Sequence, residues 1–596
     1  MFLERRYANL SSKFSSLNEN LYKSVEISSI GTVGTVRLLK GKAAKLLNFI
    51  GRSFAYSSTR SYGSFILSFG LMSLLLHLGE YYFADEPQIA YSLIVGAACA
   101  VLAIPLLIFN KPMCIALQDF ALTDIVFFEF FLIKRMQRNV DHVSIPPLVA
   151  LFLGFIPAVV GFFVPVKWVV ISMLLIVGIT VAFTTPEFPM ILTLLALPYL
   201  PILPMSKIIL LAMSVITFIS FALKVILGKR VYNFDIYDAI IGLIVLFVLI
   251  SGIAGYGENS LKNSIVFIAL ILGYFPASNL IVNRRLADCA MNAVVVSAIP
   301  ISVMAVIEFV VELPWTNYVS PEYSTPGTSA LFSTNGALAA FMIVAAVLTL
   351  AFAVEKKNKA KKIFYYSLFV FETFVIGLLL QFGALVAAIF AVAAYFILTS
   401  RKIPHDVIAV LIAAVHLLLF VPMEKLNTLS RLLGLDPTLP AVISGYKRAF
   451  KVFGENIWLG IGMGDDSYKA VTGINSSGIF NTLLGIGVEI GVFVLILFAL
   501  IILIRLRHLS YYRHYVNNSF VNTAVKMTAL STVTLLAYGA FSNIFEDATI
   551  FYLFWSVLGV CTSTLRTAKK EWDDRLGYYG DSRSAESSVV DISIRK

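Results

Sequence analysis

The basic residues best placed for chemistry lie in one polar interval, residues 423–477, which is the longest polar stretch between apolar segments. It contains Arg431 and the adjacent pair Lys447 and Arg448, just before an amphipathic stretch. Lys and Arg neutralise phosphate groups, and backbone N–H groups in glycine-rich turns add to such binding. The interval therefore predicts a site for a pyrophosphate-bearing ligand, although ordinary solvated loop charges explain the same residues.

Two carboxylates, Asp465 and Asp466, directly follow the glycine-rich sequence GIGMG in this interval. A carboxylate at a substrate site can hold an acceptor hydroxyl or act as a general base. The alternative is structural, because Asp is also a common capping residue for a helix, here one starting at Ser467.

A third carboxylate, Glu489, lies in an apolar segment together with Asn481. The two residues are eight positions apart, so on a helix they lie on nearly the same face. A carboxylate inside an apolar membrane segment is a functional candidate, since it is costly there without a partner. A structural hydrogen bond or ion pair to a neighbouring helix would equally account for it.

The composition places these residues in a membrane protein. Of 596 residues, 59% are hydrophobic and only 14% are charged, with a mean hydropathy of +0.86. Soluble domains carry about 25% charged residues, so this chain cannot cover a surface that faces water. The net charge of +11 falls in short gaps between apolar runs and at the chain ends, which indicates membrane topology and not nucleic-acid binding.

Apolar runs long enough to span a bilayer predict an all-α polytopic helix bundle with about 14–16 transmembrane helices, with spans at 405–422 and 479–505 among them. The stretch 115–133, with Asp119, Asp124 and Glu129 among aromatic residues, is expected to be interfacial and not to span. One run near residues 188–203 is short and contains three prolines, so we expect it to be broken or re-entrant. The basic clusters, one of which is Arg505–Arg513, all fall on one side, which predicts cytoplasmic N- and C-termini and places the interval 423–477 outside. The expected regions are a basic N-terminal region with an amphipathic helix (1–63), N-terminal transmembrane helices (64–312), a transmembrane core with the outer loop (313–566) and a disordered tail (567–596).

Sequence motifs of several enzyme classes are absent. The chain has no GxxxxGK[ST], HExxH or GxSxG, and its four cysteines form no CxxC pair. This argues against an ATP-driven pump, a metalloprotease or a disulfide framework, and we expect no metal site and no cofactor.

Three segments share an order and spacing with a known family. They are TPGTSALFSTNGALAAFM, then GLLLQFGALVAAIFAVAAYF, then FGENIWLGIGMG followed by SSGIFNTLLGIGVEIGVFVLI. Over residues 330–500 the chain resembles the O-antigen ligase and O-antigen polymerase superfamily of bacterial membrane proteins. In that comparison Asn335 matches the Asn that leads into a spanning helix, and Asn481 matches the Asn of a His-Asn-x-x-Leu motif with Glu489 downstream.

The resemblance implies a metal-independent, inverting glycosyltransferase that takes a glycan from undecaprenyl pyrophosphate at the outer membrane face. The chain departs from the family pattern where Gln381 and Phe382 replace a Ser-Arg pair, and where Phe480 replaces the His. A phenylalanine can neither accept a proton nor bind phosphate. The reaction would then depend on other groups, or the chain is a divergent member with altered or lost activity.

The sequence hypothesis is a protein of the bacterial plasma membrane that transfers or polymerises lipid-linked glycans for an envelope polysaccharide. The expected partners are a lipid-linked oligosaccharide donor, a glycan or glycolipid acceptor, membrane lipids and other polysaccharide assembly proteins. Two alternatives stay open, a transporter or flippase of lipid-linked sugars and a non-catalytic scaffold subunit. The candidate catalytic residues are Asp465, Asp466 and Glu489, and the candidate substrate-binding residues are Arg431, Lys447, Arg448, Asn481, Asn335 and Gln381.

Overall fold

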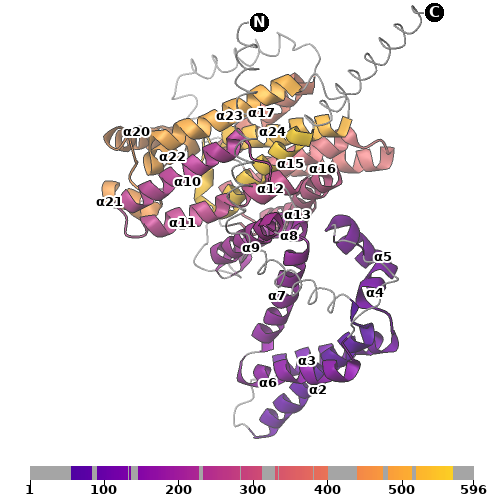
Figure 1. The fold of residues 1–596 in the computed structure, drawn as a ribbon. Helices are drawn as coiled ribbons and strands as arrows, with labels where there is room; N and C mark the ends of the chain where they lie inside the picture. Colours follow the sequence, from indigo (N-terminus) through magenta and orange to yellow (C-terminus); the bar gives the residue numbers. More distant parts are fainter. Residues whose placement is uncertain are drawn as a thin grey trace, which may run out of the picture. The chain divides into compact units, whose positions relative to one another are not determined.

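Every named secondary-structure element in the described part of the chain is a helix (Figure 1), as the apolar periodicity predicted. This computed structural model describes residues 56–83, 90–131, 133, 135, 145–164, 166–203, 205–226, 232–281, 284–311, 329–332, 334–379, 381–399, 439–473, 479, 481–512 and 519–567. The chain divides into two compact units. Unit 1 comprises Met1–Phe128, Lys134–Thr184 and Ile226–Lys229, and unit 2 comprises Glu129–Ile133, Thr185–Val225 and Arg230–Lys596.

Unit 1 is built around α2, which packs against both α3 and α6. Its small core contains Phe69, Ala158 and Val169. The stretch with Asp119, Asp124 and Glu129, expected not to span, forms short helices. The helices are α2 (Thr59–Phe83), α3 (Ala90–Ile108), α4 (Met113–Asp119), α5 (Ala121–Thr123), the π-helix η1 (Asp124–Phe130), α6 (Pro147–Phe163) and α7 (Val166–Thr184).

Unit 2 holds the remaining helices and all of the candidate site residues. They are α8 (Glu187–Ala196), η2 (Leu197–Ile202), α9 (Ser206–Ile226), α10 (Ile236–Ala254), α11 (Ser260–Ile271), α12 (Tyr274–Leu280), α13 (Arg284–Val311), α15 (Asn335–Glu355), α16 (Lys359–Leu378), α17 (Phe382–Thr399), α20 (Leu439–Glu455), α21 (Asp465–Thr472), α22 (Thr482–Ile490), α23 (Val492–Tyr512), α24 (Ser519–Tyr538), η5 (Ile544–Glu546) and a final helix Ala548–Thr567.

Seven helices in the described residues are long and apolar enough to cross a membrane, and six shorter apolar helices accompany them. The seven are Thr59–Leu78, Ser206–Ile226, Ile236–Ala254, Ser260–Leu280, Arg284–Val311, Asn335–Glu355 and Ala548–Thr567. The expected span at 405–422 and both chain ends lie outside the described residues. These helices support the predicted all-α helical bundle and are consistent with a membrane protein.

The centre of unit 2 is formed by α15 and the final helix Ala548–Thr567, which are buried along nearly their whole lengths. α15 packs against α13, α16, α17 and α24. A helix that is apolar on every face is stable only when other helices or lipid surround it. Here protein surrounds it, so α15 fixes the spacing of the helices that carry the site.

Two apolar runs are interrupted. As expected for the proline-rich run, α8 gives way at Leu197 to the 3-10 helix η2. The expected continuous span at 479–505 is wrong, because the helix stops at Ile490 and restarts at Val492. Between them Gly491 has φ +93°, and a Cβ atom there would lie 2.2 Å from the carbonyl oxygen of Trp458. A close backbone approach that only glycine permits therefore breaks the helix.

Candidate functional site

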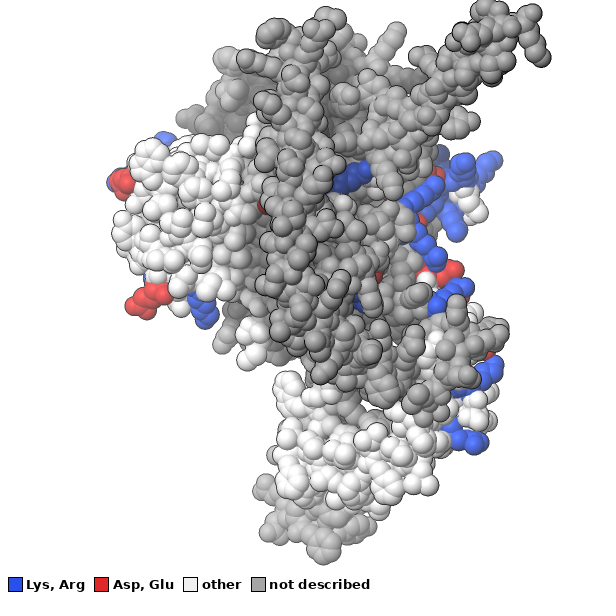
Figure 2. Space-filling model, viewed as in Figure 1, with Lys and Arg blue, Asp and Glu red and all other residues white. Residues whose placement is uncertain are grey.

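The two ends of unit 2 are identified by polar contacts along α13 and α15. At one end the guanidinium of Arg284 lies 3.7 Å from the Glu355 carboxylate. At the other end the Glu308 carboxylate accepts backbone N–H bonds from Ser329 at 3.1 Å and Ala330 at 2.5 Å. We call the first the basic end and the second the polar end. Figure 2 shows Lys and Arg gathered where α15 gives way to α16, whereas residues of both charges lie at the end formed by α20 and α21.

Helix direction brings the candidate residues to the polar end. Asn335 is the first residue of α15, Gln381 follows the end of α16, and Asn481 precedes α22. The glycine-rich segment 460–464 lies there too, since it pairs with the residues just before the α22–α23 break. Arg431 and Phe480 lie outside the described residues.

A buried tyrosine connects two of these candidates. Tyr538 is 0% exposed at the end of α24, and its hydroxyl donates to Oε1 of Gln381 at 2.8 Å. The same hydroxyl lies 3.2 Å from the carbonyl oxygen of Gly336, the neighbour of Asn335. Asn335 has a buried Oδ1 with no hydrogen-bond partner among the described residues. Gln381 is thus held by a neutral hydroxyl.

Asn481 joins the same region through a second tyrosine. Its Nδ2 donates to the hydroxyl of Tyr446 at 2.7 Å, and that hydroxyl donates to the carbonyl of Ala540. Its Oδ1 accepts the N–H of Leu484 at 2.8 Å, which caps α22. The side chain therefore positions α22 and α20 against the segment after α24.

The segment 539–543 is the common partner. Backbone N–H of Thr482 donates to the carbonyl of Gly539 at 2.7 Å, and its hydroxyl donates to the carbonyl of Ser542 at 2.9 Å. Ile544 in turn donates its N–H to the Thr482 hydroxyl at 3.1 Å. We call Asn335, Gln381, Asn481, Tyr446 and Tyr538, with the segment 539–543, the polar cluster.

The glycine-rich segment forms a separate layer beside α22. Ile461 and Gly462 donate N–H bonds of 2.9 Å to the carbonyls of Val488 and Glu489, and Tyr256 donates its N–H to the Ile461 carbonyl at 2.9 Å. The segment is thus paired on both sides by backbone bonds and does not form a free phosphate-binding loop.

The three candidate carboxylates lie along this layer. Asp466 accepts a 2.5 Å bond from Nδ2 of Asn259, and Glu489 accepts the backbone N–H of Gly464. Asp465 and Asp466 are exposed in the first turn of α21. This helix begins at Asp465 and has no side-chain cap. The expectation that the two residues cap a helix starting at Ser467 is therefore wrong. Acidic residues in a first turn also stabilise the helix through its dipole.

The candidate cations lie on α20, an amphipathic helix whose buried face contains Ala449 and Val452. Lys447 and Arg448 are exposed on its other face, beside Phe450, which is 60% exposed. Burial raises the pKa of the Tyr468 hydroxyl, and the nearby positive charge of Arg448 opposes that rise. The cations follow Tyr446 directly in the chain, so they flank the polar cluster.

Three kinds of residue gain their importance only from the structure. Tyr446, in the middle of α20, and Tyr538, the last residue of α24, hold the polar cluster, but a tyrosine in a membrane protein is usually an interfacial residue. Glu372 is fully buried in α16, and a carboxylate in the apolar run VFETFV was a visible signal. Arg505, expected in a basic cluster, is instead 5% exposed, with its guanidinium carbon 3.7 Å from the centre of the Tyr237 ring.

Comparison with protein-family models and with curated proteins found no match to this chain. Within the described residues, no group of three or more His, Cys, Asp and Glu side chains is placed to hold a metal ion. The candidate residues in the described part of the polar end are two cations, three carboxylates and three amides, and two tyrosine hydroxyls bind the amides Gln381 and Asn481.

Proposed function

We propose that unit 2 crosses the bacterial plasma membrane with its basic end in the cytoplasm. Arg284, Arg285 and five lysines between residues 356 and 362 gather at that end. Lys and Arg concentrate in cytoplasmic loops of membrane proteins. The polar end, with Lys447 and Arg448, then faces the extracytoplasmic side.

We propose that the polar end binds a lipid-linked glycan and transfers or polymerises it, as the resemblance to O-antigen ligases and polymerases implies. The observation that carries this proposal is the polar cluster. In it Tyr538 binds Gln381 and the carbonyl of Gly336, next to Asn335, while Asn481 binds the carbonyl of Ala540, two residues after Tyr538. Amides and hydroxyls hydrogen-bond sugar hydroxyls, and the two cations of α20 supply charge for a pyrophosphate.

In this proposal Lys447 and Arg448 bind the donor pyrophosphate, and Asp465 or Asp466 orients the acceptor. Glu489 supports the site indirectly, since its carboxylate holds the Gly464 backbone. One observation favours the scaffold alternative. Gln381, Asn481 and Asp466 all form hydrogen bonds with other groups of the protein, and these bonds stabilise the fold. The two functions differ in whether a glycosidic bond forms.

The test is glycan transfer in proteoliposomes that contain the purified protein, an undecaprenyl-pyrophosphate-linked oligosaccharide and a glycolipid acceptor. Replacing Lys447 and Arg448 by Ala should lower transfer by at least about 100-fold, because two charged hydrogen bonds of roughly 1.5–3 kcal/mol each are lost. The matched control replaces Lys359 and Lys361, exposed at the basic end, and should leave transfer unchanged. No transfer by the unaltered protein, or equal transfer by both double variants, would contradict the proposal.

Orientation is tested separately by cysteine labelling. Lys447→Cys and Lys361→Cys are placed in a chain lacking its four native cysteines, Cys99, Cys114, Cys289 and Cys561. A membrane-impermeant maleimide added to intact cells stripped of their outer membrane should label position 447 and not position 361. The reverse pattern would place the polar end in the cytoplasm and remove the donor-binding role.

A further inference from the structure

A carboxyl side chain lies inside the helix bundle of unit 2, away from both of its ends. Glu372 is 0% exposed in α16, after Lys359 at the start of the helix and before Leu378 at its end. At 1.5 Å per residue these two positions lie roughly 20 Å and 9 Å away along the helix axis. An ionisable side chain at such a depth in an apolar bundle is a candidate for function, because burying it is costly.

The carboxyl group of Glu372 has few partners. Neither of its oxygens forms a hydrogen bond of good geometry with any described residue. The hydroxyl of Thr349 on α15 interacts with it, but this hydroxyl is also buried and also outside good hydrogen-bond geometry. An ionised carboxylate here would therefore keep at least one buried oxygen without a donor.

No charged side chain among the described residues is placed to compensate Glu372. The helices that pack against α16 are α13, α15 and α17, and the described side chains of α17 include no ionisable group. On α13 and α15 the ionisable side chains gather at the bundle ends, with Arg284, Arg285, Asp288, Cys289 and Glu355 at the basic end and Glu308 at the polar end. On α16 itself the closest lysine in sequence, Lys362, comes almost three turns earlier, and the hydroxyl of Tyr365 binds Asn292 at 3.4 Å.

These surroundings favour the neutral acid. An ionised carboxylate taken out of water with neither a cation nor enough donors is so unfavourable that the group takes up a proton instead. The proton also makes the carboxyl a donor, for which the Thr349 hydroxyl is an acceptor. A metal ion would need several oxygen ligands, whereas Thr349 is the one other side chain of the described residues that interacts with the carboxyl.

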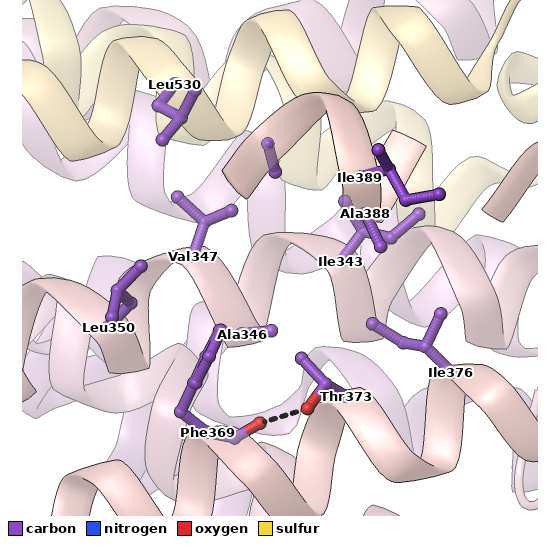
Figure 3. Close-up of a pocket in the computed structure, with 11 residues that line it drawn as sticks. Ile343, Ala346, Val347, Leu350, Phe369, Thr373, Ile376, Ala388, Ile389 and Leu530 are labelled. Carbon is purple, nitrogen blue, oxygen red and sulfur yellow. Dashed lines mark hydrogen bonds between the residues drawn. The ribbon is translucent and has the colours of Figure 1, made fainter. Parts of the chain in front are cut away.

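An apolar cavity of about 530 Å³ lies beside this acid (Figure 3). Phe369, Thr373 and Ile376 of α16 line it, and Glu372 lies within four residues of each, so its backbone borders the cavity wall. The one polar side chain of the lining, Thr373, donates its hydroxyl to the Phe369 carbonyl at 2.9 Å, as Figure 3 shows. The cavity thus leaves α16 loosely packed on the side next to Glu372.

We infer that Glu372 is a proton-binding site inside the bundle, reached from the cavity beside α16. The folded protein holds the proton at pH values where a Glu side chain in water has released it, which is above about pH 4.3. Loss of the proton leaves a buried charge and favours a movement of α16 that turns the carboxyl into the cavity. The inference is independent of the proposed function, because glycan transfer at the polar end does not use Glu372.

The first experiment compares unfolding of the unaltered protein in denaturant with that of Glu372→Gln, an uncharged side chain of nearly the same shape. Between about pH 5 and pH 7 unfolding releases the Glu372 proton, so this contribution to stability is lost as the pH rises, and Gln lacks it. The unfolding equilibrium constant of the unaltered protein, divided by that of the variant, should rise by up to about tenfold for each pH unit. Other titrating groups cancel in this ratio, since both proteins share them. A ratio that does not change with pH would overturn the inference.

Chemical modification tests the same site without replacing Glu372. Dicyclohexylcarbodiimide is an apolar reagent, and the O–H of a protonated carboxyl adds across one of its C=N bonds. With full-length protein in nanodiscs near neutral pH, mass spectrometry should find the adduct on the peptide that contains Glu372. Ala346→Phe fills the cavity and should lower this labelling by about tenfold, a change of roughly 1.4 kcal/mol. Val370→Phe adds the same ring on the exposed side of α16 and should change it less than about twofold. Absence of the adduct from Glu372, or labelling that a folded Ala346→Phe protein leaves unaltered, would refute the site.

Discussion

The sharpest test of this architecture is Gly491→Ala, because a continuous helix and a broken helix predict opposite changes in the free energy of unfolding. If residues 479–505 formed one continuous helix, alanine would stabilise the protein by about 1 kcal/mol, since glycine is a poor helix former. In the structure Gly491 separates α22 from α23 with φ +93°. A Cβ atom would lie 2.2 Å from the carbonyl oxygen of Trp458, whereas real Cβ contacts essentially never fall under 3.0 Å.

The expected cost of Gly491→Ala combines two effects. A non-glycine residue at this φ costs roughly 1–3 kcal/mol, and forcing a methyl group into a packed backbone contact costs a further 1–3 kcal/mol or so. We expect a loss of about 2–5 kcal/mol. The matched control is Gly377→Ala in α16, where a Cβ atom meets nothing within 4 Å. That variant should be neutral or stabilised by up to about 1 kcal/mol.

The measurement is unfolding of detergent-solubilised protein in increasing denaturant, followed by tryptophan fluorescence. Trp555 lies in the core of unit 2 and is 1% exposed, so it reports on unfolding there. A Gly491→Ala protein as stable as the unaltered one would refute the helix break and the close approach of Trp458. Because the glycine-rich segment 460–464 pairs with the end of α22, that result would also remove the present arrangement of Asp465 and Asp466.

Three further changes test the contacts that hold the site. Tyr538→Phe should lower stability by about 1–3 kcal/mol, because Oε1 of Gln381 loses its buried donor, and adding Gln381→Leu should recover part of that loss in the same unfolding assay. Arg505→Lys should lower the unfolding midpoint by an amount equivalent to about 2 kcal/mol, since lysine cannot stack a planar cation on Tyr237; an unchanged midpoint would show that the stack contributes nothing. Glu308→Ala should cost roughly 1–3 kcal/mol and increase proteolysis of the turn before Asn335, whereas Glu308→Gln keeps one acceptor oxygen and should retain protection.

The all-α fold class can be predicted from the sequence, because the length and composition of each apolar run indicate a helix without knowledge of its neighbours. The α22–α23 break cannot, since GVEIGVFVLI is as apolar on both sides of Gly491 as a continuous span. The residue that forces the break, Trp458, approaches through tertiary structure from 33 positions earlier in the chain. Hydropathy and helix propensity carry no information about such an approach.

The candidate site residues come from the sequence, whereas their contacts come only from the structure. Glu489 lies in α22, as expected, but Asn481 is the extended N-cap residue just before that helix, so the prediction that both lie on one helix holds only for Glu489. Their partners come from elsewhere: Tyr446 holds Asn481, and the glycine-rich segment holds Glu489. Spacing within one helix cannot reveal which neighbouring helix supplies the second group of a hydrogen bond.

The hydrogen bonding of α22 explains why the polar end can be both rigid and available for a ligand. A helix of nine residues leaves unpaired groups at both ends, and these must be satisfied inside a membrane bundle. Asn481 and Thr482 satisfy the first turn, while the carbonyl of Glu489 accepts from Ser251 at 2.9 Å and from Gly462 at 2.9 Å. Side chains that complete these bonds are fixed in place, so they are suited to orient a ligand but not to transfer protons. Chemistry at the polar end therefore depends on the groups that the fold does not use in this way, foremost the exposed cations of α20.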